Sequence, residues 1–385
     1  MPSQEPLPMV AAERERNVDN LTPILNLLSH TPFECLGAEQ LTGGALNFTF
    51  RGRLASPLSD GSQSIIIKYS KDYVLRGTVD TTIPASRCGN EYQILEGLSS
   101  HIPPAYHDRF IIKPPRPYQI FPQDGVQVIQ DFQNTTPLLG LLLHPVESDL
   151  SPPFAASVGH AIGIWLRSFH SQPSKHGNSR CLSSLSSIEK DFDGRDKLRN
   201  YYYDILEQKI RMFPHLFDGI ANKIKEYAAE EIERKNNQPG MGLVHGDFSL
   251  RNLLISETTS RSGENILLSP IDWEFSHHGR RDQDLCHITS ELYILQELKG
   301  IKSCEVFLQG LIAGYGESQG SSVYNIAVYF GIHILSWVSI ITPETTKEQE
   351  EGLVRFARDL IIKGREKNRG WLEGTVMRYF FSERQ

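Results

Sequence analysis

Apolar and polar positions alternate differently in the two parts of the chain. Between Cys35 and Gln130, short apolar and β-branched runs are separated by turn residues, which is typical of β-strands. The predicted strands are Cys35–Leu41, Phe48–Leu54, Ser64–Tyr69, Pro117–Phe121 and Val126–Gln130. A short helix is predicted before them, from Thr22-Pro23 to about Leu28, because threonine caps helices and proline suits the first turn.

From Leu138 onward the apolar positions recur every three to four residues, which predicts helices. The predicted helices are Pro153–His170, Arg195–Met212, His215–Lys235, Gln283–Leu298, Cys304–Tyr315, Val323–Ile340 and Lys347–Arg365. The polar, serine-rich stretch Ser171–Ser187 is predicted to be a loop. Val323–Ile341 has the length of a membrane span, but its polar residues favour a buried helix.

The composition is that of a globular enzyme. The chain has 385 residues, enough for two cores, and its net charge of −7 disfavours nucleic acid or an anionic membrane as its main partner. The cysteines are scattered without Cys-x-x-Cys spacing, and the polar segment 1–20 lacks the apolar core of a signal peptide. We therefore expect a cytoplasmic protein with reduced thiols and no obligate protein partner.

One stretch, Leu243–Ile255, combines chemistry-bearing residues with apolar flanks. It places His245, Asp247 and Asn252 on a short loop between two apolar runs. An acceptor hydroxyl needs a carboxylate that orients it and takes its proton, and Asp247 fits that role. His245 is interpreted as a residue that orients the loop.

A second apolar run, Ile266–Ile271, ends at Asp272. Two strands joined by the polar turn at 257–265 would return Asp272 to the side of Asn252. An amide oxygen and a carboxylate are hard ligands, so Asn252 and Asp272 are predicted to hold Mg²⁺ on ATP phosphates. Turn and cap roles for these residue types are the alternative, but the combined spacing favours phosphoryl transfer.

The first part of the chain supplies residues suited to a nucleotide. Gly43 and Gly44 lie at the bend between two predicted strands, where backbone N–H groups can approach phosphates. Lys68 ends an apolar strand and can reach the α- and β-phosphates, while Glu91 opens a helical pattern and can form an ion pair with Lys68. An exposed lysine and a first-turn glutamate are the alternative.

These residues resemble the signature of the aminoglycoside phosphotransferase/choline kinase superfamily. The matching segments are His245-Gly246-Asp247 with Asn252, Asp272-Trp273-Glu274, and the following Gly279 and Asp284-Leu285. Gly43-Gly44-Ala45-Leu46-Asn47 and Asp272-Trp273-Glu274-Phe275 resemble the methylthioribose kinase and fungal hydroxytryptamine kinase branch. The resemblance covers roughly residues 21–359.

The resemblance implies an α+β, bilobal protein-kinase-like fold with a small β-rich N-lobe and a larger, mostly helical C-lobe. The expected division is a tail at 1–20, an N-lobe at 21–132 and a C-lobe at 133–385. Asn47 is implied to help bind the nucleotide. The backbone of Gln130 and Phe132 is implied to bind the adenine edge at the hinge.

The acceptor site is less well marked. Tyr329, His333 and Trp337 are spaced four residues apart and share one helix face, which suits a substrate with a ring or an amine. A core helix with a satisfied histidine is an equally weighted alternative. Asp284 is predicted to hold the catalytic loop, and Arg251 and Arg280 are interpreted as solvated side chains.

The sequence predicts an ATP- and Mg²⁺-dependent kinase acting on a hydroxyl group of a small molecule. A pseudokinase is the main alternative, although Lys68, Asp247, Asn252 and Asp272 are all present. Gly316-Glu317-Ser318-Gln319-Gly320 matches the serine hydrolase motif but follows a helical pattern, so a loop is expected. A protein kinase is disfavoured because no Ala-Pro-Glu segment is found. The acceptor stays open among methylthioribose, hydroxytryptamines, choline-like alcohols, homoserine, aminoglycosides and other metabolites.

Overall fold

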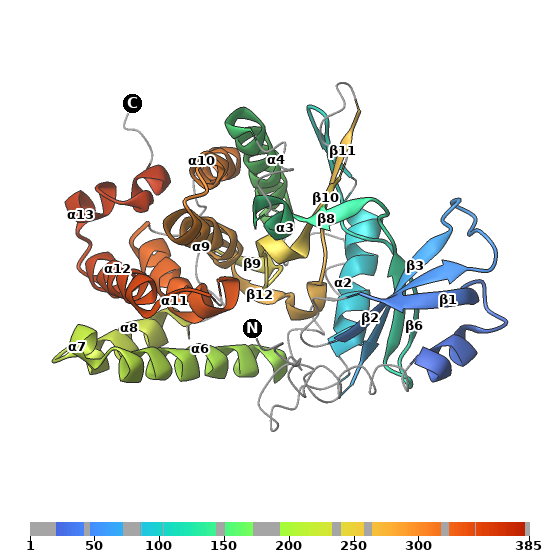
Figure 1. Ribbon diagram of the computed structural model, residues 1–385, viewed down its shortest axis with the longest axis horizontal. Coiled ribbons are helices and arrows are strands. Elements are labelled where there is room, and N and C mark those ends of the chain that lie inside the picture. The colour runs from blue at the N-terminus through green and yellow to red at the C-terminus, as the bar shows by residue number, and fades with distance from the viewer. Residues whose placement is uncertain are drawn as a thin grey trace, which may run out of the picture. The chain divides into compact units, whose positions relative to one another are not determined.

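The computed structural model divides into two compact units, each with its own sheet (Figure 1). It describes residues 21–41, 47–71, 85, 87–102, 104–143, 151–171, 193–232, 240–257, 264–316, 323–342 and 344–381. The first unit comprises residues 1–99 and 115–133, and the second comprises 100–114 and 134–385. The predicted boundary near residue 132 therefore falls close to one crossing of the chain, but residues 100–114 group with the second unit.

The first unit is built on a five-stranded antiparallel sheet. Its strands, in spatial order, are β1 (Cys35–Gln40), β2 (Asn47–Leu54), β3 (Ser64–Ser70), β7 (Val126–Gln130) and β6 (Pro117–Phe121). Residues 21–28 form the predicted helix, and Ile24 and Leu28 pack against Phe48, Phe50 and Ile67 of the sheet. Helix α2 (Arg87–His101) carries Glu91. All five strands predicted from the alternating pattern are present.

The second unit contains a five-stranded mixed sheet and a two-stranded sheet. The first has the order β4 (Ala105–His107), β5 (Phe110–Ile112), β11 (Ile266–Pro270), β10 (Leu253–Ser256) and β8 (Thr135–Pro137). The second pairs β9 (Met241–Val244) with β12 (His277–Arg280). Among the strands that the structure describes, only β5 and β11 pair in parallel. The polar turn predicted between β10 and β11 thus joins an antiparallel pair, as the spacing required.

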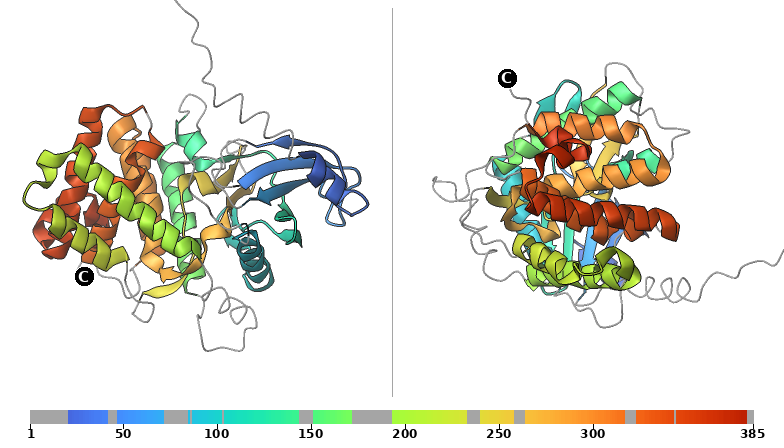
Figure 2. Two further views of the ribbon diagram at one scale, coloured as in Figure 1. Left: turned by 90° about the horizontal axis from the view of Figure 1, so that it is seen from below. Right: turned by 90° about the vertical axis from the view of Figure 1, so that its left-hand side faces the viewer.

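Helices make up most of the second unit. They are α3 (Leu138–Leu143), α4 (Pro152–His170), α6 (Asp193–Met212), α7 (Pro214–Phe217), α8 (Ala221–Ile232), α9 (Arg281–Lys299), α10 (Ser303–Tyr315), α11 (Val323–Ile341), α12 (Lys347–Arg365) and α13 (Arg369–Glu373). Helix α9 packs against both α10 and α11, while α11 and α12 lie side by side (Figures 1 and 2). In the part of the chain that the structure describes, no helix combines the length and apolarity that a bilayer crossing needs.

Helices α4 and α10 approach each other unusually closely. Gly159 and Gly163 of α4 face Gly310 and Gly314 of α10. A Cβ atom added at any of the four would lie 2.2 Å from a backbone carbonyl oxygen of the opposite helix. Two glycines four residues apart on each helix therefore allow the two backbones to touch.

Two local predictions differ from the structure. The helix predicted over His215–Lys235 is broken into α7 and α8 by a turn at 218–220, where Gly219 adopts a φ of 67°. Left-handed backbone cannot continue an α-helix, so the glycine marks the break. The short strands β4, β5 and β8 were not predicted, since three residues are too few to show an alternating pattern.

Candidate active site

The loop that carries Asp247 lies between β9 and the single-turn helix η1 (Leu250–Asn252). Gly246 has a φ of 86°, and a Cβ there would lie 2.2 Å from the carbonyl oxygen of Phe275. Both the conformation and the space therefore require glycine at this position. The backbone N–H of Asp247 donates to Nδ1 of His245 (3.3 Å), which leaves Nε2 as the donor to the carbonyl of Ile271 (3.0 Å). His245 thus orients the loop, as predicted.

Asn252 is hydrogen-bonded directly to Asp247. Its amide nitrogen donates to the backbone carbonyl of Asp247 (3.0 Å) and to Oδ2 of the Asp247 carboxylate (2.8 Å). Both acceptors are oxygens, so the amide orientation is fixed. The amide oxygen of Asn252 accepts no hydrogen bond from the described residues, which suits a metal ligand.

Asp272 follows β11 and lies beside the same loop. Leu253 of β10 pairs with Pro270 of β11, and the N–H of Ile271 donates to the carbonyl of Asn252 (2.9 Å). Asp272 itself has a φ of 67° and begins the short helix η2 (Trp273–Phe275), in which Trp273 is fully buried. Left-handed backbone is uncommon outside glycine, so the local strain fixes where this carboxylate points.

The electrostatics of Asp247 indicate a site built for a cation. Burial, followed by the negative charge of Asp272, raises the pKa of Asp247 to about 6. A pair of half-buried carboxylates with an open amide oxygen is a donor set of hard oxygens, which fits Mg²⁺. Among the described residues no three His, Cys, Asp or Glu side chains converge as a metal site, so phosphates and water would supply the remaining ligands.

Asp284 holds the catalytic loop in place through hydrogen bonds to its backbone, as predicted. Its Oδ2 accepts from the N–H of His245 (2.7 Å) and its Oδ1 from the N–H of Gly246 (3.0 Å). His170, the last residue of α4, bridges Oδ2 of Asp284 (3.0 Å) and the hydroxyl of Tyr315 on α10 (2.8 Å). These bonds hold the pKa of Asp284 below its usual value despite complete burial. No local pattern in the sequence marks His170 or Tyr315 as a supporting residue.

Glu291 is a second supporting carboxylate that sequence reasoning missed. It is 2% exposed, and its Oε2 accepts from the N–H of Leu250 at 2.7 Å. Burial raises the pKa of Glu291 to about 7. Glu291 lies seven residues after Asp284, which is two helical turns and hence the same face of α9. That spacing was the available signal, although the other polar residues of α9 obscure it.

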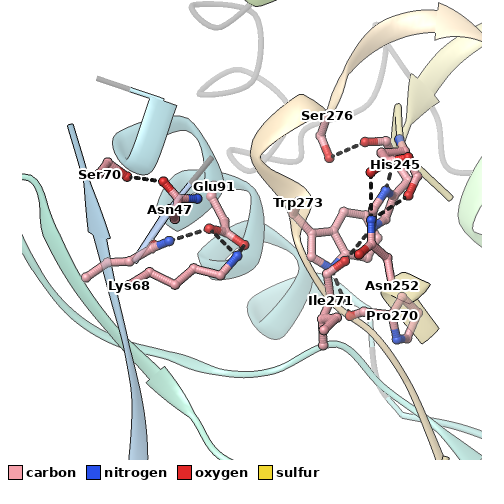
Figure 3. Close-up of polar contacts among 12 residues, drawn as sticks. Asn47, Lys68, Ser70, Glu91, His245, Asn252, Pro270, Ile271, Trp273 and Ser276 are labelled. Atoms are coloured by element: carbon pink, nitrogen blue, oxygen red, sulfur yellow. Dashed lines mark hydrogen bonds and ion pairs between the residues drawn. The ribbon is translucent and has the colours of Figure 1, made fainter. Parts of the chain in front are cut away.

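In the first unit the predicted ion pair is present. The ammonium of Lys68 donates to both oxygens of Glu91 (2.7 and 3.0 Å), and both side chains are buried. Gln127, opposite Lys68 in the register of β3 and β7, also donates to Glu91. Figure 3 shows Lys68 directed at the Glu91 carboxylate. A buried pair of this kind is held in one geometry because either partner alone would be an uncompensated buried charge.

The other predicted nucleotide contacts remain predictions. Gly43 and Gly44 lie outside the described residues. Asn47 accepts a hydrogen bond from the hydroxyl of Ser70 (2.7 Å). The N–H of Gln130 donates to the carbonyl of Arg116 (2.8 Å), so a purine contact there would use the carbonyl oxygen of Gln130. Phe132 is 8% exposed.

The three predicted acceptor residues differ in exposure. Tyr329 and His333 are 4% and 1% exposed, and His333 bonds the hydroxyl of Ser290 (2.5 Å) while stacking on His287 (4.3 Å). Their burial favours the core-helix alternative for these two. Trp337 is half-buried and lies under the guanidinium of Arg251 at 5.4 Å.

Arg280 is not solvated, which corrects the interpretation from sequence. It is 6% exposed and forms ion pairs with Asp282 (2.6 Å) and Glu231 (2.8 Å). The two carboxylates raise the pKa of the guanidinium, even though burial acts in the opposite direction. Arg280 also packs on the ring of Tyr329 at 5.2 Å. It therefore stabilises the interior of the second unit.

The chain is similar to known proteins in sequence and in fold. The chain is 26% identical over 376 residues to Phosphotransferase FrzJ from Cladobotryum sp., covering 94% of this chain and 96% of that protein. Amicoumacin kinase hAmiN, solved with AMP-PNP, Ca²⁺ and Ami, aligns with a TM-score of 0.50 at 13% identity, over 91% of this chain and 96% of that one. No family model matches the chain.

A mutant of aminoglycoside 2′-phosphotransferase-IIIa in complex with GDP also aligns, with a TM-score of 0.50 at 13% identity, over 92% of this chain and 99% of that one. The chain has the aminoglycoside phosphotransferase/choline kinase fold. The predicted α+β, protein-kinase-like fold class is thus confirmed, as is the resemblance to that superfamily. The narrower resemblance to the methylthioribose and hydroxytryptamine kinase branch stays a prediction.

Proposed function

We propose that the protein is a kinase that transfers the γ-phosphate of ATP to a hydroxyl group of a small molecule, with Mg²⁺. One observation carries the proposal. Asp247 and Asn252 lie on one loop with Asp272 beside it, and next to these two carboxylates the amide oxygen of Asn252 accepts no hydrogen bond from the described residues. The names of the similar proteins support it, since FrzJ is a phosphotransferase and hAmiN is a kinase solved with a nucleotide analogue and a divalent cation.

Each residue has a role that follows from its surroundings. Lys68, held by Glu91, binds the α- and β-phosphates. Asn252 and Asp272 hold Mg²⁺, which when bound neutralises phosphate charge. Asp247 accepts a hydrogen bond from the acceptor hydroxyl and so orients its oxygen toward the γ-phosphorus.

Atoms and charges balance in the transfer. The acceptor oxygen forms a bond to the γ-phosphorus while the bond from that phosphorus to the bridging oxygen of ADP breaks. The electron pair of the broken bond leaves with ADP, and the hydroxyl proton passes to Oδ1 or Oδ2 of Asp247. Because the pKa of Asp247 is raised to about 6, the carboxylate is ionised at neutral pH yet accepts a proton more readily than an exposed aspartate.

The acceptor is proposed only as a class, a hydroxylated small molecule. The experiment is a thermal-shift titration with Mg·ATP, followed by an ADP-release screen over hydroxylated amines, sugars and alcohols. We expect a Mg²⁺-dependent rise in melting temperature and ADP release with one acceptor class.

The Asp247→Asn variant is the internal control, because it keeps the size of the side chain and removes the base. It should keep the thermal shift with Mg·ATP and lose most turnover. Turnover at the wild-type rate in this variant contradicts the role of Asp247. Nucleotide binding by the wild-type protein without turnover on any acceptor favours the pseudokinase alternative.

A further inference from the structure

Arg251 is a charged residue of the catalytic loop to which the proposed reaction assigns no role. It lies four residues after Asp247 and directly before Asn252, in the turn η1. Its side chain is 34% exposed, whereas the neighbouring Leu250 is fully buried. The cation is therefore accessible from solvent at the point where the predicted base and the predicted metal ligand meet.

The guanidinium of Arg251 packs on an aromatic ring but donates no hydrogen bond within the described residues. Its central carbon Cζ lies over the indole of Trp337, 5.4 Å from the ring centroid. The nearest carboxylate oxygen, on Glu291, is 3.9 Å away, which is too long for a hydrogen bond. Across the described ranges of the chain, the guanidinium donates no hydrogen bond, so its N–H donors are available to a ligand.

Two other arginines of the described chain donate to carboxylates through both arms of the guanidinium. Arg51 donates to both oxygens of Asp131 (2.9 and 3.2 Å), and Arg280 likewise donates to both oxygens of Asp282 (2.9 and 2.6 Å). Arg251 instead lies 3.9 Å from Oε1 of Glu291, whose other oxygen accepts the N–H of Leu250. The guanidinium of Arg251 thus lies over the ring of Trp337, and its N–H donors are available to a ligand.

The platform beneath Arg251 is rigid. Trp337 stacks on His333 (5.5 Å, 23°), and His333 stacks on His287 (4.3 Å, 30°). His333 and His287 are buried, so the stack reaches into the core of the second unit. A flat cation on such a support loses little conformational freedom when it binds a ligand.

Several acidic side chains surround the catalytic loop, so a positive charge nearby is favourable. Asp247, Asp272 and Glu291 are three acidic groups close to the place where a phosphoryl group would be transferred, and the charge of Asp272 raises the pKa of Asp247. Arg251 supplies a positive charge four residues after Asp247, in the adjoining turn η1.

We propose that Arg251, supported by Trp337, binds an oxyanion beside Asp247 during the reaction. A guanidinium fork matches two oxygens of a phosphoryl group or of a carboxylate. The oxyanion is either the phosphoryl group in transfer, whose charge is spread over three oxygens, or an anionic group on the acceptor. The inference rests on the proposed function, and the experiment below separates the two sources.

The test compares Arg251→Gln and Arg251→Lys with the wild-type protein and with Arg355→Gln. Arg355 is a matched control because it lies on α12 with a side chain 54% exposed and pairs only with Glu351 in the same helix turn. For each protein we would measure kcat and the KM of the acceptor found in the screen. We would also measure the melting temperature with Mg·ADP, with and without fluoroaluminate, which mimics the transferring phosphoryl group.

If the phosphoryl group is the oxyanion, Arg251→Gln lowers kcat by roughly 10²- to 10³-fold with little change in the acceptor KM, since it removes a donor used in the transition state. The extra stabilisation by fluoroaluminate over Mg·ADP alone then disappears. If the acceptor carries the oxyanion, the acceptor KM rises at least tenfold and the fluoroaluminate effect persists. Arg251→Lys should recover part of the loss in either case.

Unchanged kcat, KM and fluoroaluminate stabilisation in Arg251→Gln, as expected for Arg355→Gln, would overturn the assignment. A lower melting temperature of the free variant with unaltered kinetics has the same meaning, because it shows a structural role alone. A wild-type protein that does not respond to Mg·ATP or Mg·ADP overturns the proposed function and this assignment together. Wild-type turnover with an unaffected Arg251→Gln variant overturns this assignment only.

Discussion

The crossing of α4 and α10 gives a prediction whose sign is fixed by the structure. Replacing Gly163 with alanine adds one methyl group in the middle of the contact. Its Cβ would lie 2.2 Å from the carbonyl oxygen of Leu311 and 2.7 Å from the backbone nitrogen of Tyr315, whereas ordinary contacts begin near 3.4 Å. Both atoms belong to the backbone of α10, so no side-chain rotation relieves the overlap.

The magnitude follows from two opposing terms. Forcing an extra methyl group into a packed interior destabilises by about 1–3 kcal/mol, and the rigid surroundings here place the effect at the upper end. Alanine in place of glycine within a helix stabilises by about 1 kcal/mol. The net loss is about 2 kcal/mol, which lowers the melting temperature by roughly 4–8 °C for a unit of this size.

The matched control is Gly352→Ala on α12. That glycine is also inside a helix, but a Cβ there meets nothing within 4 Å. Only the helix term applies, so the melting temperature should rise by roughly 2–4 °C. Differential scanning calorimetry of the two variants under identical conditions measures both. A Gly163→Ala variant at least as stable as wild type would refute the packing argument, because the control shares its backbone term.

Three further predictions concern the candidate site. The kcat/KM of the wild-type protein should fall as the pH is lowered through about 6, because Asp247 then takes up a proton and can no longer act as a base; a profile flat to pH 5 would contradict this. Asp272→Asn should weaken Mg·ATP binding at least tenfold, as measured by nucleotide titrations with and without Mg²⁺. The melting temperature of the free variant should stay that of wild type, because asparagine tolerates the left-handed backbone. Asp272→Ala should lose stability as well as Mg·ATP binding. Gln127→Leu should raise the KM for ATP several-fold with a smaller effect on kcat, since Glu91 loses a donor and holds Lys68 less firmly; an unaltered KM would show that the lysine suffices.

The sequence was sufficient where chemistry and spacing are local. Asp247 and Asn252 share one loop, and the turn between β10 and β11 is short, so their juxtaposition with Asp272 follows from strand pairing alone. The ion pair of Lys68 and Glu91 was predicted because a strand-end lysine and a helix glutamate are complementary. Short apolar and β-branched runs between turn residues also predicted the first sheet, although its strands β3 and β7 are buried on both faces.

What the sequence did not show depends on contacts between distant segments. The bond from His170 to Asp284 joins positions 114 residues apart, and nothing in either local pattern marks it. Arg280 looked like any charged residue near a turn, and only the structure shows that Glu231 neutralises it in the core. The imidazole of His333 could bind a substrate or pack in a core, and the choice depends on the neighbours that α9 supplies.

The parallel pairing of β5 with β11 has a consequence for the order of events during synthesis. Phe110–Ile112 pairs with Ile266–Leu268, so β5 leaves the ribosome about 150 residues before its partner. At roughly 5–20 residues per second, that interval lasts on the order of 10–30 s. During that time β4 and β5 have no sheet to join, so the apolar strand Phe110–Ile112 has no partner other than β4. A fragment that ends at residue 133 would carry that exposed hairpin permanently, so the first unit is better isolated with residues 100–114 replaced by a short polar linker.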